Sequence, residues 1–578
     1  MSDDDYAPRQ WHPDERPTLP GSPSTPSHST PRRIAYFLIG TLVTLTGGLG
    51  NALVTVNLVN LQGTLGVFSA EINWLPTAYV MTNVSMNLLL VKFRQQFGLR
   101  AFTEFFLVLY ALVTFGHLFV GDLGSAIAVR AAHGMVGAAL STLGLYYTLQ
   151  AFKKAWRPRG IVISTGMSQL AQPIAYIFSR SLLQLAEWRG LYLFELGLTL
   201  VTLAAVLWLK LPPGDRFKAF RPMDFLTFSL FAPGMALLCA ALTFGRVLWW
   251  TENAWVGIAL AVSIVLLLAA ICVEHNRDNP LLNIRWLTNG MIVRLALALM
   301  LVRVVLSEQS IGAVGFLRLV GLNNDEMQTL FIVILLSTIL GIVVSVLIIR
   351  PPHLMAPQVV ALLIMALGAW VDSHASNVTR PAQLYVSQGM LAFGGVMFLG
   401  PLLLTMMGSV IANPANLISF SVLFGLTQNL GGLIGSSLLG TFQVMREKYH
   451  SSVLAEQLSS LDPLVAARIQ QGGAAYGRLL ADPSARSRQG ISVLTQAATR
   501  EANILAYNDV FLLIAILATL LAAWIFGRAL WLTYVAPPPP PAPAPPAPPD
   551  PTDSPIAVPS GDRRLAPRPP QPTPAVPT

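Results

Sequence analysis

Charged residues are scarce in this chain. Asp, Glu, Lys and Arg make up 11% of its 578 residues and 53% are hydrophobic, whereas soluble domains carry about 25% charged residues. The mean hydropathy is +0.58. Apolar stretches of roughly twenty residues recur along the chain, each long enough to cross a bilayer core as a helix that satisfies its own backbone hydrogen bonds. This composition excludes an ordinary soluble domain and predicts an all-α polytopic membrane protein.

Cysteines and catalytic motifs are also scarce. The two cysteines, Cys239 and Cys272, both lie inside apolar runs, so we expect neither a disulfide framework nor a metal site. The sequence contains no phosphate-binding Walker loop, nucleophile elbow or zinc-ligand spacing. A membrane enzyme such as an acyltransferase would need a concentrated His/Asp constellation near one membrane face, and we find none. We therefore expect no enzyme activity, cofactor or metal.

The net charge of +9 does not indicate a nucleic-acid partner. The basic residues lie in short loops between apolar runs, where membrane topology explains them better than a recognition surface does. The first 31 residues are polar and rich in proline and serine. We therefore expect no cleavable signal peptide, and a first membrane span that acts as its own insertion signal.

The apolar runs predict fourteen membrane spans. They cover residues 34–58, 73–91, 102–121, 125–150, 160–184, 189–210, 223–245, 254–274, 290–317, 327–349, 355–372, 384–409, 415–441 and 507–534. Residues 1–31 have the composition of a disordered tail. A second disordered tail, 535–578, is proline-rich ("APPPPPAPAPPAPPDPTDSP") and is either a spacer or a ligand for a polyproline-binding module.

Basic residues are distributed unequally between the two sets of loops. One set carries Lys92, Arg94, Arg100, Lys153, Lys154, Arg157, Arg159, Lys210, Arg216, Lys218, Arg221, Arg277 and Arg285. The positive-inside rule places these loops, and with them both termini, in the cytoplasm. On the opposite side, the long loop 442–506 mixes charged and apolar positions at helical spacing, which predicts one to three helices outside the membrane.

Five stretches carry a family resemblance. They are "WLPTAYVMTNVSMNLL" (74–89), "FGLR" (97–100), "VRAAHGMVGAAL" (129–140), "EWRGLYLFELGL" (187–198) and "FGLTQNLGGLIGSSLLGTF" (424–442). In this order and spacing they resemble the major facilitator superfamily, in its fourteen-helix drug:proton antiporter branch.

The resemblance implies a two-bundle transporter with 14 transmembrane helices. The first six-helix bundle would cover 32–222, two additional helices 223–275, and the second six-helix bundle 276–534, including the external loop 442–506. It also implies export across the inner membrane of a bacterium. The partners implied are a small-molecule substrate, protons and the lipid bilayer, together with a periplasmic adaptor protein and an outer-membrane channel that the external loop would contact.

The chain also departs from this family at several functional positions. Gln95 replaces the Asp of the second cytoplasmic loop motif, and Ala52 stands near an acidic position of the first span. The glycine-rich motif of the fifth span is replaced by "YIFSRS" (176–181), which introduces Arg180. Glu195 replaces a usual Asn. We therefore expect proton coupling to use residues other than the usual ones.

The apolar run "ALALMLVRVVLSEQSIGAVGFL" (296–317) contains Arg303 and Glu308. A charge in mid-membrane costs about 2.5–3.5 kcal/mol, so both side chains should face a water-filled cavity or polar partners. Five residues of helix separate their directions by about 140°. Arg303, Ser307 and Ser310 share one face, and Glu308 projects from another.

Three residues are candidates for proton coupling. Glu308 is the first, and its alternative role is a structural ion pair between spans. Arg130 matches a family arginine that the resemblance links to proton transfer. Glu195 is the third, and its alternative role is a structural hydrogen bond.

Seven residues are expected to line a central substrate cavity: Arg303, Arg180, Asn57, Tyr79, Ser307, Gln309 and His133. Arg303 would bind an anionic substrate group or serve structure. For Asn57, which matches a family Asn, and for Tyr79, packing is the alternative. His133 could be an interior histidine with satisfied hydrogen bonds.

The sequence thus predicts a secondary transporter that exports small lipophilic or amphipathic molecules by proton antiport, through rocking of two bundles about a central site. One alternative is proton-coupled uptake of an organic anion, whose carboxylate Arg130, Arg180 and Arg303 could bind. Another is a transport-inactive scaffold.

Overall fold

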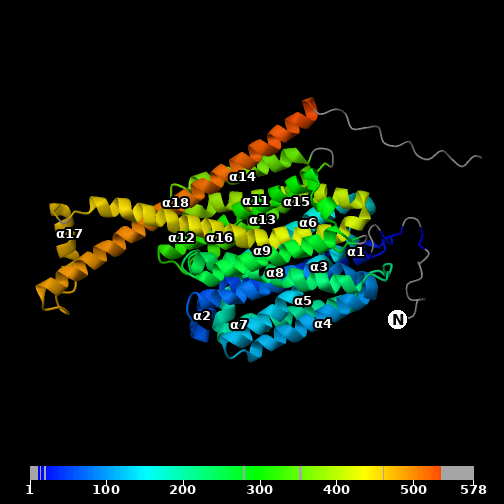
Figure 1. The fold of residues 1–578 in the computed structure, drawn as a ribbon, viewed down its shortest axis with the longest axis horizontal. Helices are drawn as coiled ribbons and strands as arrows, with labels where there is room; N and C mark the ends of the chain where they lie inside the picture. Colours follow the sequence, from blue (N-terminus) through cyan, green and yellow to red (C-terminus); the bar gives the residue numbers. More distant parts are fainter. Residues whose placement is uncertain are drawn as a thin grey trace, which may run out of the picture. The chain divides into compact units, whose positions relative to one another are not determined.

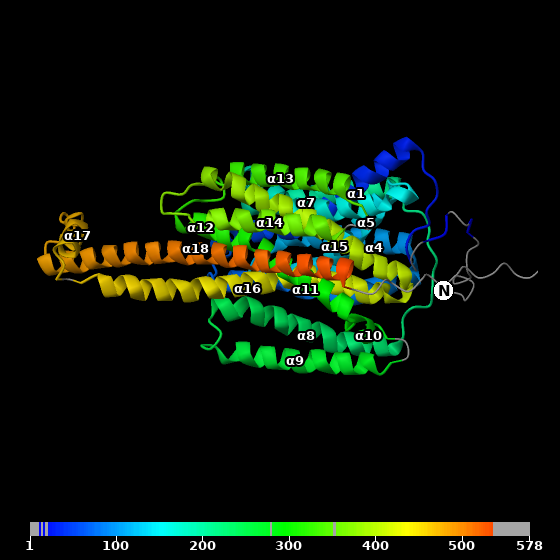
Figure 2. The same ribbon diagram turned by 90° about the horizontal axis from the view of Figure 1, so that it is seen from above.

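The computed structural model describes residues 11–12, 15–17, 21–277, 280–350, 354–459 and 461–535. Contacts divide the chain into two units, Met1–Ala529 and Leu530–Thr578. Of the second unit, the structure describes the end of the last helix and Val535, so the rest of the predicted proline-rich tail lies outside the described residues. Within the described part, all regular structure is helical (Figures 1 and 2), as the composition predicts.

The first half of the main unit consists of seven helices. They are α1 (Thr30–Val56), α2 (Leu58–Leu65), α3 (Trp74–Phe97), α4 (Leu99–Gly116), α5 (Leu123–Gln150), α6 (Arg157–Ser168) and α7 (Ala171–Trp208). α1 packs against α5 and α7, α3 packs against α5, and α4 packs against α5 and α7. Asp122 begins α5 with a capping box, in which its side chain and that of Ser125 bond each other's backbone N–H. The Ser125 hydroxyl also donates to the Asp122 carboxylate, and this hydrogen bond, followed by the one from the Ser125 backbone N–H, lowers the pKa of Asp122.

The second half comprises the helices from Ile284 onward. They are α11 (Gly290–Leu306), the π-helical turn η5 (Gln309–Ala313), α12 (Val314–Leu319), α13 (Gln328–Ile348), α14 (Met355–Asp372), α15 (Tyr385–Ala412), α16 (Leu417–Gln457), α17 (Pro463–Ala474) and α18 (Pro483–Tyr534), with the short α10 (Ile284–Leu287) before them. α13 and α14 pack against α15, and α11 packs against α15 and α16. The apolar faces of α11, α14, α15 and α16 form one core cluster that also includes Val510, Ile514 and Ala518 of α18.

Two helices lie between the halves in sequence, α8 (Pro222–Val247) and α9 (Ala254–His275). They pack against each other, and α8 also contacts α3 of the first half and α16 of the second. α9 lies at the outer edge of this pair (Figure 2) and exposes apolar side chains such as Ile258 and Val265. The pair therefore covers one flank of the unit, where a bilayer would shield the outer face of α9.

The structure bears on the span count. Twelve helical stretches among the described residues are long and apolar enough to cross a membrane. The longest, Lys154–Trp208, contains a break at Ala186 and Glu187, and Glu187 has a φ of 50°. Gly190 is needed at this break because an added Cβ would collide with the carbonyl of Leu182. α3 is 24 residues long but is not among the twelve. The count of fourteen, and the division into two six-helix bundles and an inserted pair, stay predictions.

Residues 442–459 and 461–506 form a helical hairpin. α16 continues through its first arm to Gln457, α18 begins at Pro483 and supplies the second arm, and α17 joins them (Figure 1). The two arms are fixed at their base because Arg446 Nε donates to Asp509 Oδ2 at 2.6 Å and Gln443 Nε2 donates to Asn503 Oδ1 at 2.9 Å. The predicted helices are present, as extensions of two long helices with one short helix at the tip.

Residues 21–29 lie against the end of the unit that is opposite the hairpin. Ser22 and Ser24 are buried. The backbone N–H of Ser24 donates to Pro213 O at 2.9 Å, and Gln150 Nε2 donates to Ser24 O at 3.0 Å. His28 Nε2 lies 3.0 Å from Gln150 Oε1. This segment, called the N-terminal strap below, is therefore packed and hydrogen-bonded, which composition alone did not predict.

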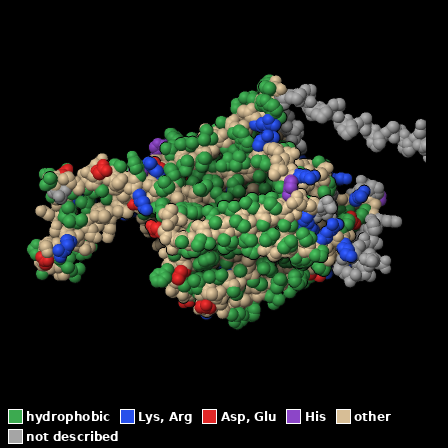
Figure 3. Space-filling model, in the orientation of Figure 1, with side chains coloured by type: hydrophobic (Ala, Val, Ile, Leu, Met, Phe, Trp, Pro, Cys, Tyr) green, Lys and Arg blue, Asp and Glu red, His purple; other side chains and the backbone are tan. Residues whose placement is uncertain are grey.

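The surface agrees with a membrane environment. Apolar side chains cover the flank of the helical unit in Figure 3, and Lys and Arg side chains gather near the end that carries the strap. Exposed apolar residues such as Phe105, Leu200, Leu336 and Leu363 belong to this flank-forming set of helices. Contiguous exposed apolar surface of this kind is stable only against lipid or another protein.

Candidate functional site

Arg130 on α5 anchors a polar cluster inside the first half. Its side chain is fully buried. Nη1 donates to Gly50 O at 2.9 Å, and Nη2 donates to Asn51 Oδ1 at 2.7 Å. The guanidinium lies 4.6 Å from the ring centre of Tyr79, within cation–π range. Arg130 Nη1 is also 3.2 Å from His133 Nδ1.

Glu195 on α7 completes this cluster. Its Oε1 lies 2.8 Å from His133 Nε2 and accepts a hydrogen bond from Tyr110 Oη at 2.9 Å. Gly50 permits this approach, since an added Cβ would collide with Tyr110, Glu195 and His133. We call Asn51, Tyr79, Tyr110, Arg130, His133 and Glu195 the N-half cluster. It brings together four of the predicted site residues, Arg130, Glu195, His133 and Tyr79. Both Arg130 and Glu195 have direct hydrogen-bond partners in it.

Two other predicted residues lie elsewhere. Asn57 is buried at the end of α1, where its Nδ2 donates to Ser179 Oγ at 2.7 Å and to Leu53 O at 2.8 Å. Arg180 Nε is 3.6 Å from Asp325 Oδ2, and both side chains are more than half exposed, at 53% and 54%. Exposed ion pairs of this kind contribute little stability. Neither Asn57 nor Arg180 lines the cavity described next.

A cavity of about 140 Å³ lies between the two halves. Its lining residues are Gln169, Gln172, Pro173, Arg303, Leu306, Ser307, Gln309, Ser310, Phe331, Ile334, Thr338, Ala392, Gly395, Val396 and Gly432. Three predicted cavity residues, Arg303, Ser307 and Gln309, are among them. The cavity wall combines a guanidinium, three glutamine amides and hydroxyl groups with an apolar side.

Each half contributes a helix interruption to this cavity. In the first half, α6 ends at Ser168 and α7 starts at Ala171. Pro173 has no backbone N–H to offer the carbonyl of Gln169 four residues earlier, which explains the break. In the second half, α11 ends before Ser307 and passes into the π-helical turn η5. Such turns are frequent at functional sites, and transporter substrates often bind where membrane helices are discontinuous.

Glu308 lies behind the cavity wall instead of on it. Its side chain is fully buried, and its Oε1 accepts from Gln388 Nε2 at 2.9 Å. The same Gln388 nitrogen donates to Asp372 Oδ2 at 2.8 Å. We call Glu308 and Asp372 the carboxyl pair. The side-chain amide of Gln388 bridges them. Within the described residues, no cationic side chain forms an ion pair with either carboxyl group. The structural ion pair considered for Glu308 is therefore not seen there.

Sequence reasoning missed Asp372, Gln388, Gln169 and Gln172. Each is a polar residue in or at the end of an apolar run, which is the signal that identified Arg303. Asp372 is the last residue of its helix, where an acid is unremarkable by position, and the glutamines carry no charge. Only the packing of α14 against α15 brings Asp372 to Gln388.

Comparison with known proteins decides the family. The sequence pattern of the Major Facilitator Superfamily matches residues 40–436, more than half of the chain. The chain belongs to the major facilitator superfamily. It is a multi-pass membrane transporter and not an enzyme, as the motifs implied. Its place in the fourteen-helix branch stays a prediction.

Relatives within the superfamily are distant. The multidrug transporter mfsC of Aspergillus fumigatus is 28% identical over 229 residues, which cover 39% of this chain and 43% of mfsC. An uncharacterized transporter of Bacillus subtilis, YhcA, is 22% identical over 439 residues, 73% of this chain and 80% of YhcA. An auto-inhibited peptide transporter of the POT family has a similar structure, with a TM-score of 0.52 and 14% identity over 89% of this chain and 99% of that one. At this identity the likeness concerns the fold alone.

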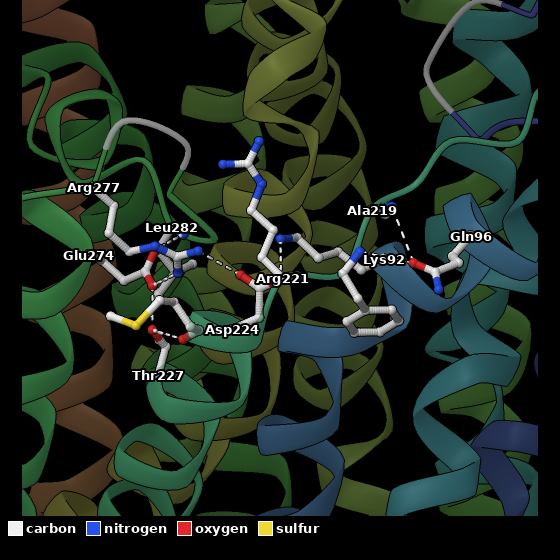
Figure 4. A network of polar contacts seen from close by, with 11 residues as sticks. Lys92, Gln96, Ala219, Arg221, Asp224, Thr227, Glu274, Arg277 and Leu282 are labelled. Carbon is white, nitrogen blue, oxygen red and sulfur yellow. Dashed lines mark hydrogen bonds and ion pairs between the residues drawn. The ribbon is translucent and has the colours of Figure 1, made fainter. Parts of the chain in front are cut away.

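Gln95 lies in the last turn of α3, and a network of charged side chains from α3, α8 and α9 lies near this end of the helix (Figure 4). Lys92 Nζ donates to Asp224 Oδ2 of α8 at 2.6 Å, and Arg277 Nη2 donates to Asp224 Oδ1 at 2.9 Å. Arg277 also pairs with Glu274 of α9. Burial opposes the charge on Arg277, but the two carboxylates outweigh it and raise its pKa. The helices α8 and α9 thus supply the acids for this charge network.

Proposed function

We propose that this protein is a proton-coupled antiporter that exports small amphipathic organic molecules. The substrate would bind in the cavity between the two halves, and the proton on the carboxyl pair Glu308 and Asp372. The cavity supports this proposal because its wall comes from the α6–α7 junction and α7 on one side and from α11, η5, α13, α15 and α16 on the other. Rocking of the halves would open it to either side of the membrane in turn.

The carboxyl pair is the observation that carries the coupling proposal. Glu308 Oε2 and Asp372 Oδ1 are buried without a hydrogen-bond partner in the described structure. A carboxylate buried without a cation is costly, and such groups usually become neutral by holding a proton. Two acids that share Gln388 repel each other when both are ionised. A site of this kind can hold a proton in a closed state and release it when water enters.

Glu308 is also coupled to the cavity by the chain itself. Its neighbours Ser307 and Gln309 both line the cavity, and Glu308 directly precedes η5. Movement of the Glu308 side chain on losing its proton would therefore shift the π-helical turn that forms the substrate side. This links the protonation state to the shape of the binding site, which antiport requires.

Flux in proteoliposomes tests the proposal. With an imposed proton gradient, the wild type should move at least one of four amphipathic probes: ethidium, Hoechst 33342, 8-anilinonaphthalene-1-sulfonate or the smaller anion benzoate. Glu308→Gln and Asp372→Asn should each reduce gradient-driven flux roughly a hundredfold or more, from the lower end of the range that one proton-transfer group contributes. Asp325→Asn, which removes an exposed acid, is the control. Equal gradient-driven flux in wild type and Glu308→Gln would refute coupling through Glu308, and no gradient-driven flux at all would favour the scaffold alternative.

The hairpin 442–506 is our proposed contact for a periplasmic adaptor protein, which would place it outside a bacterial inner membrane, with the strap in the cytoplasm. Its tip exposes Leu461, Leu464 and Leu479 at 91%, 80% and 80%, and exposed apolar clusters often mark protein contacts. Deleting residues 458–482 should leave flux in proteoliposomes unchanged but remove export from intact cells. Unchanged export from cells would refute the adaptor contact.

A further inference from the structure

The charge balance of the cavity points to its ligand. Among the residues that line it in the described structure, Arg303 is the one charged group, and no carboxylate belongs to the wall. A guanidinium offers five N–H donors. Arg303 Nε has no partner, and Nη1 reaches Gln169 Oε1 only at 3.4 Å, beyond the usual range for a hydrogen bond of this kind. No ion pair with Arg303 occurs among the described residues.

The surroundings hold this guanidinium at the cavity. Gly431 and Gly432 of α16 lie against the Arg303 side chain, and an added Cβ at Gly432 would be 3.6 Å from Nη2. Glycine at both positions therefore leaves room beside the guanidinium. Arg303 is partly exposed to the cavity, and a charge inside a membrane-embedded helix bundle is unfavourable when no anion neutralises it. A charge kept in this state is more readily explained by a ligand that neutralises it than by a structural role.

We propose that the substrate of the cavity is a small amphipathic carboxylate, whose carboxylate binds Arg303. This rests on the proposed function, because it names the substrate of the same site. The planar fork of arginine matches a carboxylate in a two-point contact. Gln169, Gln172 and Ser307 on the cavity wall offer further amide and hydroxyl groups, while Phe331, Ile334 and Val396 provide an apolar surface for the rest of the molecule.

The volume of the cavity limits the size of the carboxylate that can bind. At about 140 Å³ it is smaller than the roughly 300–1,000 Å³ of pockets for drug-sized ligands. A one-ring or short-chain monocarboxylate suits this volume better than a large hydrophobic drug does. A lipophilic cation would find no acid on the cavity wall, because Glu308 and Asp372 are bound to Gln388 behind it.

Binding to the detergent-solubilised full-length protein tests this assignment, with no proton gradient present. Benzoate, its neutral analogue benzamide and the cation benzylamine are matched probes. Benzoate should raise the thermal unfolding temperature in a saturable manner, and the other two should not. Arg303→Gln should weaken the apparent Kd for benzoate roughly tenfold or more, as expected for a lost hydrogen bond to a charged group, and Arg303→Lys should fall between. Arg318→Gln, which removes an arginine outside the cavity from the same segment, should bind like wild type.

The variants also separate ligand binding from a structural role. Without ligand, Arg303→Gln should unfold at the same temperature as wild type or higher, because it removes an unpaired charge. A lower unfolding temperature would assign Arg303 to structure and overturn the proposal. So would equal stabilisation by benzamide, benzoate binding that survives Arg303→Gln, or absence of any benzoate effect on wild type. If chloride alone raised the unfolding temperature of the wild type as much as benzoate does, the site would be assigned to an inorganic anion instead of a carboxylate. Failure of coupling through Glu308 would change none of these binding results.

Discussion

The N-half cluster and the central cavity use the same residue types in opposite ways. In the N-half cluster, Arg130 donates to two oxygen acceptors and Glu195 accepts from Tyr110 beside His133. At the cavity, Arg303 has one long contact with Gln169 and no partner for Nε, and Glu308 has only the amide of Gln388. Balanced buried charges are expected to stabilise one packing arrangement, whereas unbalanced ones respond to protons, ligands and water. We therefore expect the N-half cluster to stabilise the fold, and the residues at the cavity to respond to protons and substrate.

The largest effect should come from unbalancing the N-half cluster. Glu195→Leu would leave His133 buried without its acid and Arg130 in a cluster without a negative charge, and should cost about 3–5 kcal/mol of stability. Glu308→Leu is the matched control, since it removes an acid that no cation pairs with, and should cost far less. Thermal and denaturant unfolding in detergent would measure both. Equal losses in the two variants would break the comparison. Flux through Glu195→Gln, which keeps hydrogen-bonding capacity, separately tests the predicted coupling role of Glu195.

A smaller loss is expected at the charge network of α3, α8 and α9. Lys92→Met removes one donor from Asp224, which keeps Arg277, and should cost roughly 1.5–3 kcal/mol, as for a hydrogen bond between charged groups. Lys210→Met is the control, because the pair of Lys210 with Glu104 is largely exposed and such pairs contribute at most about 1 kcal/mol. If Lys210→Met were as destabilising as Lys92→Met, burial would not be what gives this network its strength.

The sequence predicted the fold class and part of the site. A charge in a run such as 296–317 is conspicuous, and Arg303 with its neighbours Ser307 and Gln309 does line the cavity. The 140° between Arg303 and Glu308 is consistent with their different surroundings, although the sequence did not show that Glu308 lies behind the wall. Asp372 and Gln388 could not be found this way, because a single sequence does not tell which helix faces meet.

The N-terminal strap and the charge network near Gln95 also depend on packing that a single sequence does not show. Composition favoured disorder for residues 1–31, yet Ser24 is held by backbone and side-chain hydrogen bonds from the α7–α8 connection and α5. Gln95 marked a departure from the family pattern in the sequence, but it did not show which charged residues lie near it. The acids of this network, Asp224 and Glu274, belong to helices remote in sequence, and only the packing of α8 against α3 brings Asp224 to Lys92.

A modest effect should come from the carboxyl pair itself. If Glu308 and Asp372 share one proton, Glu308→Gln and Asp372→Asn each relieve the same repulsion, and each should change stability by no more than about 1 kcal/mol. The double variant should then differ from the sum of the single effects, because the two groups are in one network, where interaction energies of roughly 0.5–3 kcal/mol are usual. Additive effects in unfolding experiments would show that the two acids act independently and would remove the pair from the mechanism.

The smallest effect should be a pH dependence of the N-terminal strap, where His28 is only partly buried. Burial lowers the pKa of His28, the hydrogen bond with Gln150 opposes this, and Arg32 and Arg33 lower it further. A histidine with a lowered pKa in the bound state stabilises that state fully above its usual pKa of about 6.5 and less as pH falls through that value and below. Proteolysis within residues 21–29 should therefore speed up between pH 7.5 and pH 5.5 relative to cleavage elsewhere in the chain. His28→Asn keeps a hydrogen-bond donor for Gln150 without titrating, so it should remove this pH dependence; if the dependence persisted, another group would control release of the strap.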